Sequence, residues 1–240
     1  MEQSLPFTAH KFLEELSTLQ TDTEIKNVQR FFRDEGSENK LMGIRMANLF
    51  ALAKKFAGMS INEIERLLEN EYYEARMGAV CIMDFQARDK KTSPERKKEL
   101  FDLYISKHKF INNWDMVDRS APYVVGGYLF DKPREILYKL AKSENVWERR
   151  TAIVATYYFI RQNDVEDTFK IAELLVNDEH DLVQKAVGSW IREAGKRDEE
   201  RLLDFLDRFS ATMPRVMLRY AIEKLDKETR EGYLKRASNV

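Results

Sequence analysis

One stretch that decides the fold is Asp181-Leu-Val-Gln-Lys-Ala-Val-Gly-Ser-Trp-Ile-Arg-Glu-Ala194. Its apolar residues recur every three or four positions and form one stripe of a helix, made of Leu182, Val183, Ala186, Val187, Trp190 and Ile191. The polar side of the same helix carries Ser189 together with Lys185, Arg192 and Lys196. The periodicity therefore predicts that Trp190 faces the core, one helical step away from the polar Ser189.

Helical periodicity extends from this stretch to both ends of the chain. A capping box, Ser60 with Glu63, predicts the start of one helix, and Ser93 followed by Pro94 predicts the start of another that runs to about His108. Further helices are expected over roughly residues 7–19, 132–142, 146–161, 164–176, 199–209, 214–225 and 228–236. No segment shows the sustained alternation of apolar and polar residues that is typical of a strand.

The spacing of these helices indicates the architecture. They are short, are joined by brief polar linkers, and recur as pairs every 35–45 residues or so, which is typical of HEAT and armadillo units. We therefore expect an all-α fold, an α-solenoid of HEAT-like helix pairs that forms one curved domain over residues 1–240 with a concave binding face. Gly126-Gly127 interrupts an apolar segment, and we expect a close contact between helices there.

Composition excludes several classes of protein. The chain has 240 residues, only 9 Gly and 5 Pro, and 40 basic against 41 acidic residues for a net charge of -1. That near-neutral total lacks the basic excess of many nucleic-acid-binding domains, although a solenoid can gather its basic residues on one face. Cys81 is the single cysteine and the three histidines are scattered, so a disulfide framework or a metal site is not expected. No signal peptide or membrane span is visible, so we expect a soluble, cytoplasmic protein.

The segment around Trp114 breaks the repeating pattern. If a helix begins there, Trp114 and Asp118 lie four residues apart on one face, whereas Asp115 is placed to cap or brace the first turn. An indole beside a carboxylate suits a cationic ligand, because the ring face attracts positive charge and the carboxylate stabilises it. Two structural alternatives stay open: Trp114 as a core anchor, and Asp118 as a simple ion-pair partner of Arg119 or Arg150.

Three ordered motifs resemble the AlkD-type DNA alkylation repair glycosylases, which are built from HEAT-like repeats. The motifs are Asn113-Trp-Asp-Met-Val-Asp118, Ser143-Glu-Asn-Val-Trp-Glu-Arg-Arg-Thr-Ala-Ile153 and Val183-Gln-Lys-Ala-Val-Gly-Ser-Trp-Ile-Arg-Glu193. Weaker matches begin at Leu41 and at Glu74, so that the resemblance covers about residues 41–200. It implies excision of N3- or N7-alkylated purines from duplex DNA, without a metal or an organic cofactor.

The resemblance also implies roles for individual residues. Asp118 stabilises the positively charged sugar and orients or deprotonates water, Trp114 packs against the deoxyribose, and Arg150 holds a phosphate or fixes the carboxylate. The lesion stays stacked in the duplex in this family, so the catalytic groups approach from the backbone side. We expect a monomer, because the outer faces of the solenoid are polar.

Two departures qualify this resemblance. Ser189 stands where the family has a second important tryptophan, so either Trp114 works alone with Asp118 or excision is weaker or altered. The near-neutral charge requires basic residues to gather on one face, for which the candidates are Lys107, Lys109, Arg119, Arg149, Arg150, Lys185, Arg192 and Lys196, with Ser189 beside them. Each of these charges taken singly is equally consistent with a solvated face. Trp147 opens a largely apolar helix and is interpreted as a core residue.

Two other functions remain alternatives to the enzyme. One is a non-catalytic HEAT-like module that binds distorted or branched DNA, and the other is a protein-interaction scaffold. The pair of Trp114 and Asp118 favours the enzyme, whereas Ser189 and the near-neutral charge favour the alternatives.

Overall fold

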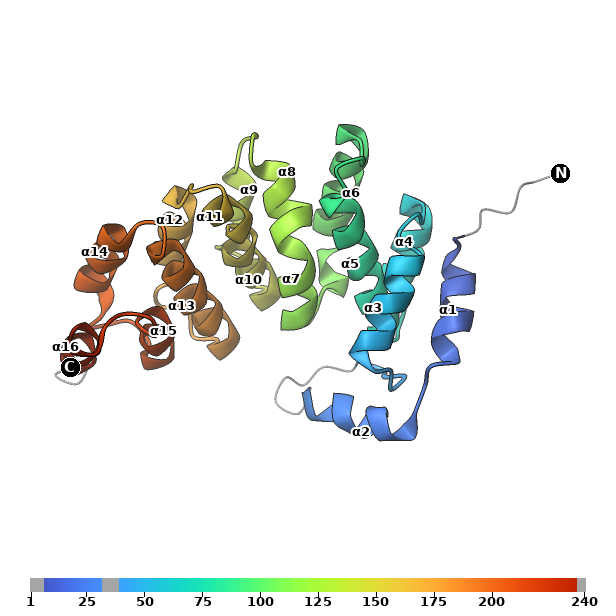
Figure 1. Ribbon diagram of the computed structural model, residues 1–240, viewed down its shortest axis with the longest axis horizontal. Helices are drawn as coiled ribbons and strands as arrows, with labels where there is room; N and C mark the ends of the chain where they lie inside the picture. The colour runs from blue at the N-terminus through green and yellow to red at the C-terminus, as the bar shows by residue number, and fades with distance from the viewer. Residues whose placement is uncertain (1–6, 32–38, 237–240) are drawn as a thin grey trace. The chain divides into compact units, whose positions relative to one another are not determined.

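The computed structural model describes residues 7–31 and 39–236, and its regular structure there is helical (Figure 1). The β-type pairings among these residues are two isolated bridges, Gln20 with Ile44 and Lys40 with Tyr72. The all-α prediction is therefore confirmed. The chain divides into two compact units, Met1–Asn112 and Asn113–Val240, each with its own core. That the whole chain acts as a single domain stays a prediction.

Unit 1 is built around one buried helix. Helix α5 (Tyr73–Arg88) has nearly every residue buried, and it contacts helices before and after it. Because Phe12 lies against Gly78, where a Cβ atom would fall 2.5 Å from the ring, the first helix also packs on α5. The other elements of unit 1 are α1 (Ala9–Ser17), α2 (Asp22–Phe31), α3 (Met46–Lys55), α4 (Ile61–Leu68), α6 (Pro94–Ser106) and the 3-10 turn η1 (His108–Phe110).

The two predicted helix starts in unit 1 turn out differently. Ser93 accepts a hydrogen bond from the backbone N–H of Arg96 at 3.2 Å, and α6 begins at Pro94 as expected. Helix α4 does follow Ser60, but the Ser60 side chain makes no capping hydrogen bond, so the predicted capping box is wrong. The carboxylate of Glu63 instead accepts the backbone N–H of Ala9 at 2.6 Å, because α1 packs against this end of α4.

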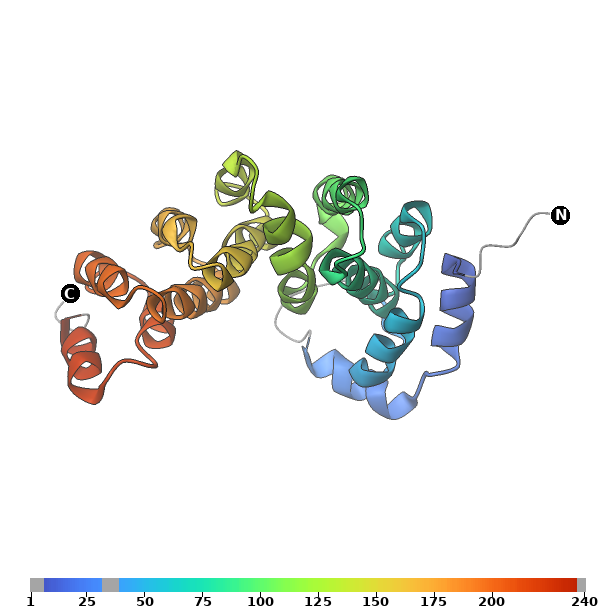
Figure 2. The same ribbon diagram turned by 45° about the horizontal axis from the view of Figure 1, so that its top comes forward.

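Unit 2 stacks helix pairs. Helices α10 (Val146–Ala155), α13 (Asp181–Gly195) and α15 (Arg215–Ala221) begin about 35 residues apart and contact one another in sequence order, as HEAT-like units do. In Figure 2 they form one row, and α9 (Glu135–Leu140), α12 (Glu166–Leu174) and α14 (Glu199–Phe209) form a second row beside them. The remaining elements are α7 (Trp114–Ser120), the π-helix η2 (Ala121–Gly126), α8 (Gly127–Leu129), α11 (Tyr157–Arg161) and α16 (Lys227–Arg236).

Two glycines allow helices of unit 2 to approach closely. A Cβ atom on Gly126 would lie 2.1 Å from the carbonyl oxygen of Ala155, which confirms the close contact expected at Gly126-Gly127. A Cβ atom on Gly188 would lie 2.4 Å from the carbonyl oxygen of Met217. Gly188 therefore sets how near α15 lies to α13, and so where the side chains of α15 reach.

The helices of the described residues are all too short or too polar to cross a bilayer.

Candidate functional site

Helix α7 carries the two central residues of the site. Asn113 caps it by accepting the backbone N–H of Trp114 at 2.9 Å, and Asp115 accepts the N–H of Met116 at 2.8 Å, so Asp115 braces the first turn as expected. Trp114 and Asp118 then lie one turn apart and both line the same cleft. Trp114 is half-buried rather than a core anchor.

Asp118 is held by Arg150, which comes from α10. The guanidinium grips the carboxylate with two hydrogen bonds, from Nε to Oδ1 at 3.0 Å and from Nη2 to Oδ2 at 2.8 Å. The remaining terminal nitrogen, Nη1, donates to the carbonyl oxygen of Leu182 in the first turn of α13. The Arg150 side chain is 8% exposed but that of Asp118 is 33% exposed. The carboxylate is therefore fixed in orientation by a charge-assisted pair and still faces open space.

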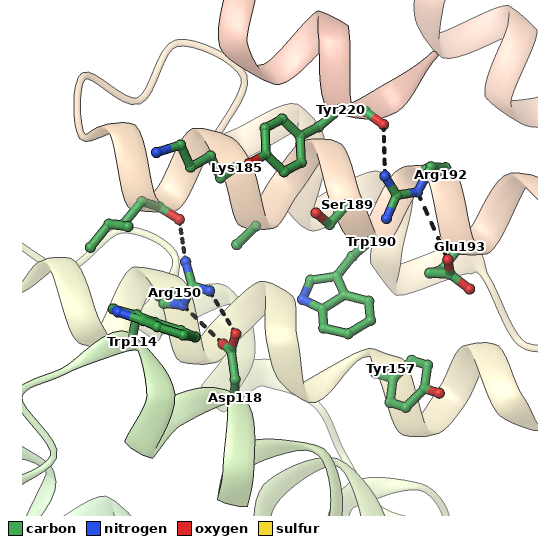
Figure 3. Close-up of a pocket in the computed structure, with 12 residues that line it drawn as sticks. Trp114, Asp118, Arg150, Tyr157, Lys185, Ser189, Trp190, Arg192, Glu193 and Tyr220 are labelled. Atoms are coloured by element: carbon green, nitrogen blue, oxygen red, sulfur yellow. Dashed lines mark hydrogen bonds and ion pairs between the residues drawn. The ribbon is translucent and has the colours of Figure 1, made fainter. Parts of the chain in front are cut away.

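The open space beside Asp118 is a cleft of about 690 Å³ within unit 2. Its walls come from α7, α10, α11, α13 and α15, and Figure 3 shows the side chains that line it. Aromatic rings supply much of the wall, from Trp114, Tyr157, Trp190 and Tyr220. Charged or polar groups share it, namely Asp118, Arg150, Lys185, Ser189, Arg192 and Glu193.

Trp190 is not a core residue, contrary to the prediction from periodicity. It is half-buried, lines the cleft beside Ser189, and packs its ring on Tyr157 with centroids 4.8 Å apart (Figure 3). Val183, Val187 and Ile191 are fully buried, so the stripe itself was predicted correctly. The indole lies at the edge of that stripe, where α11 covers only part of it. An indole is thus present in the cleft one position after Ser189.

Trp147 is not a core residue either. It sits in the first turn of α10, is half-buried, and meets His180 edge-on with ring centroids 6.2 Å apart. The first turn of a helix projects past the packed part of its neighbours, which leaves the indole partly exposed.

The cationic residues predicted to bind DNA on α10 and α13 all have acidic partners. Lys185 pairs with Asp181, and this hydrogen bond raises the pKa of the Lys185 ammonium. Arg192 pairs with Glu223, and Lys196 pairs with Glu193 at 2.6 Å. Arg149 binds Asp178 at 2.6 Å and the carbonyl oxygens of Ser143 and Glu144 at 3.0 and 2.9 Å, and it does not line the cleft.

The other predicted basic contacts lie elsewhere. Lys107 and Lys109 belong to unit 1, where Lys107 bridges Glu65 and Glu69 and the exposed Lys109 lies over the ring of Phe110. Arg119 is a half-buried residue of α7 that does not line the cleft. The structure therefore brings Lys185, Ser189 and Arg192 to the cleft that Trp114, Asp118 and Arg150 also line. Lys196 is exposed and does not line the cleft.

Sequence reasoning missed Tyr157, Glu193 and Tyr220 as lining residues. Tyr157 begins α11 after a break at Thr156, but residues 146–161 read as one continuous helix. Tyr220 reaches the cleft because α15 approaches α13 at Gly188, and no local pattern signals such an approach. Among the residues that the structure describes, no three His, Cys, Asp or Glu side chains gather as metal ligands.

Comparisons with known proteins bear on the family and the fold of the chain. A sequence profile described as "DNA alkylation repair enzyme" matches residues 12–225. A solved structure described as a predicted DNA alkylation repair enzyme from Enterococcus faecalis superimposes with a TM-score of 0.69, covering 87% of this chain and 98% of that one. Its sequence identity is 18%, so this likeness shows the fold alone. No curated protein gives a significant match.

Proposed function

The chain belongs to the DNA alkylation repair enzyme family, which gives it a role in DNA repair, and from this premise we propose a DNA glycosylase activity. The substrate is duplex DNA that contains a cationic N3- or N7-alkylated purine, and the bond hydrolysed is the N-glycosidic bond. One observation carries this proposal: the Asp118 carboxylate is held rigidly by Arg150 and yet is one-third open to a cleft with aromatic walls.

The chemistry needs a fixed negative charge more than it needs an acid. An alkylated purine already carries a positive charge, so the base leaves with the bonding electron pair as a neutral molecule. The positive charge moves to the deoxyribose, which takes on oxocarbenium character in the transition state. Asp118 stabilises that charge, and water adds to the anomeric carbon while its proton passes to the carboxylate or to solvent.

The neighbours of Asp118 supply orientation and a binding wall. Arg150 fixes the carboxylate with two hydrogen bonds, so no reorganisation is needed when the sugar becomes positive. Trp114 presents an indole next to Asp118, and such a ring attracts a cation through its electron-rich face. Trp190, packed on Tyr157, extends the aromatic wall and takes the place of the missing indole at Ser189.

Contact with the DNA backbone falls to Lys185, Arg192 and Lys196, together with Ser189. Lys185, Arg192 and Lys196 each exchange a carboxylate partner for a phosphate on binding. The separation of these ion pairs costs free energy and reduces the net gain from the phosphate contacts. We propose a monomer that acts on DNA in the cytoplasm without a metal or an organic cofactor.

Release of 7-methylguanine from methylated duplex DNA tests the proposal. The single-turnover rate of Asp118→Asn should fall about 10²- to 10³-fold below wild type, the loss typical of removing one charge-stabilising group. Asp204→Asn is the matched control, because Asp204 is an exposed aspartate on α14 that does not line the cleft. Its rate should equal that of the wild type.

Absence of release by the wild type would overturn the glycosylase proposal. Duplex binding that weakens with added salt, without release, would identify a non-catalytic DNA-binding module. Absence of both would identify a protein-interaction scaffold.

A further inference from the structure

A chain of hydrogen bonds connects the Asp118–Arg150 pair to His180, a residue that does not line the cleft. His180 is the N-cap of α13, and its Nδ1 accepts the backbone N–H of Leu182 at 3.3 Å. The carbonyl oxygen of that same Leu182 accepts a hydrogen bond from Nη1 of Arg150, whose other two nitrogens hold Asp118. Leu182 is therefore shared between the cap of α13 and the clamp on the carboxylate.

The His180 ring is itself held in place. Its backbone N–H donates to Oδ1 of Asp178 at 2.9 Å, and its ring meets the edge of Trp147. Asp178 in turn forms an ion pair with Arg149, which directly precedes Arg150 on α10. The loop before α13 is thus tied to the same helix that carries Arg150, which leaves the cap little freedom to drift away from Leu182.

We propose that His180 is a positioning residue for Asp118, and that it acts through the first turn of α13 and Arg150. This inference rests on the proposed glycosylase function. A neutral His180 accepts from Leu182 and keeps the Leu182 carbonyl where Arg150 meets it. A protonated ring has donors on both nitrogens and no acceptor, so the cap is lost and the first turn of α13 loosens. Arg150 then loses one of its anchors, and the carboxylate moves away from the sugar it stabilises.

The surroundings of His180 favour the neutral, accepting ring at neutral pH. Burial lowers the pKa of His180, and the charges of Arg149 and Arg150 act in the same direction. Asp178 and Asp181 oppose them. Since the ring binds a proton less readily in the folded protein than in the unfolded chain, its cap is intact at a pH of about 6.5 and above, and it is lost only as the pH falls through the lowered pKa of the folded state.

Two substitutions separate the cap from the titration. Asparagine is among the best N-cap residues and does not titrate, so His180→Asn keeps the cap at every pH, whereas His180→Ala removes it at every pH. We expect the single-turnover release of 7-methylguanine by wild type to fall progressively between pH 7.5 and pH 4.5, towards the rate of His180→Ala and so by at most about tenfold, after subtraction of the uncatalysed rate. His180→Asn should stay within about twofold across this range, and His180→Ala should be about tenfold slower at pH 7.5 with unchanged affinity for the duplex.

A second measurement needs no activity. The Nε–H of Arg150 is held by Asp118, so its exchange with water, followed by ¹⁵N NMR in the free protein, should be slow in wild type and His180→Asn and fast in His180→Ala. Equal rates and equal exchange in all three proteins would overturn the role of His180. A pH dependence in His180→Asn equal to that of the wild type would overturn it too. A wild type that releases no base defeats the proposed function, and the exchange comparison then decides by itself whether His180 positions the pair.

Discussion

Each unit contains a carboxylate and an arginine that lie near each other and, unlike most charged residues, are partly or fully shielded from solvent. In unit 1, Glu74 is fully buried and its two oxygens accept the backbone N–H groups of Met42 and Gly43 at 2.9 and 2.8 Å. In unit 2, Asp118 accepts from Arg150 along one edge and keeps a third of its side chain exposed.

The arginines differ in the same way. Arg76 is buried in unit 1 and donates to the carbonyl oxygens of Asn70 and Glu71 at 2.8 and 3.0 Å, so it fastens a loop. Arg76 also donates to the side-chain oxygens of Asn39 and Asn112, so its hydrogen-bond partners among the described residues are all neutral groups of unit 1. Arg150 is equally buried, but two of its three nitrogens donate to a carboxylate that faces a cleft. A buried charge that is held by neutral groups stabilises the fold, whereas an oriented charge with an open side can also act on a ligand.

The largest expected effect is on the rate of base release in Asp118→Asn, which tests whether Asp118 acts on a ligand rather than stabilising the fold. We expect Asp118→Asn to reduce release of 7-methylguanine about 10²- to 10³-fold while lowering the free energy of unfolding by about 1–2 kcal/mol, because the buried Arg150 keeps an amide oxygen as one partner but loses its counter-charge. Urea denaturation followed by circular dichroism, run beside the release assay, measures both quantities. A large loss of stability with little loss of rate would place Asp118 in the same class as Glu74.

Glu74→Ala should show the opposite behaviour. The substitution leaves the N–H groups of Met42 and Gly43 without their acceptor inside the protein, which costs roughly 3 kcal/mol of unfolding free energy. Urea denaturation measures this loss, and Glu71→Ala is the exposed control on the same segment, expected within about 0.5 kcal/mol of wild type. Near-wild-type stability of Glu74→Ala would contradict the structural role.

Arg150→Lys should lower both the rate of base release and the free energy of unfolding. A lysine has one ammonium group and cannot make the two parallel bonds to Asp118 while reaching Leu182. We expect release about 10- to 100-fold slower and unfolding free energy lower by about 1–2 kcal/mol. Arg76→Lys is the comparison in unit 1 and should affect stability without a matching loss of rate per folded molecule.

Trp190 tests where the cleft ends and the core begins. A fully buried tryptophan replaced by alanine costs about 3–5 kcal/mol, so a half-buried Trp190 should cost about 1–2 kcal/mol in Trp190→Ala. Duplex affinity or release should fall about tenfold, and Trp190→Phe should recover most of the loss, because a ring still packs on Tyr157. A cost of 4 kcal/mol or more in urea would restore the core interpretation.

The smallest expected effect concerns the paired cations. Glu223→Gln removes the nearer of the two acidic partners of Arg192, the other being Glu193 at 3.8 Å. Duplex binding at about 50 mM salt should therefore tighten about two- to threefold and weaken more steeply as salt is added. Fluorescence anisotropy over a salt series measures both, with Glu231→Gln on α16 as the control. Unchanged binding in Glu223→Gln would remove Arg192 from the DNA contacts.

Local signals predicted most helices of the second half of the chain. Helix α14 has the predicted bounds, and α13 ends one residue beyond its predicted end. These bounds could be predicted because capping residues and the spacing of apolar residues are local signals that can be recognised in the sequence. Helix α3, the π-helix η2 and the break at Thr156 were not predicted. Each depends on packing against another helix, as Gly126 shows where it meets Ala155.

The sequence by itself determined that Trp114 and Asp118 share one face if a helix begins at Trp114, because residues four apart are neighbours in any α-helix, and helix α7 does begin there. The sequence allowed either Arg119 or Arg150 as the ion-pair partner of Asp118. Its helical periodicity predicted, wrongly, that Trp190 faces the core. Only the tertiary structure shows that the partner of Asp118 is Arg150, which lies 32 residues away along the chain. Only the tertiary structure places Trp190 in the wall of the cleft. Helical period sets the direction in which a side chain points, whereas its burial and its ion-pair partner depend on which neighbouring helix occupies that direction.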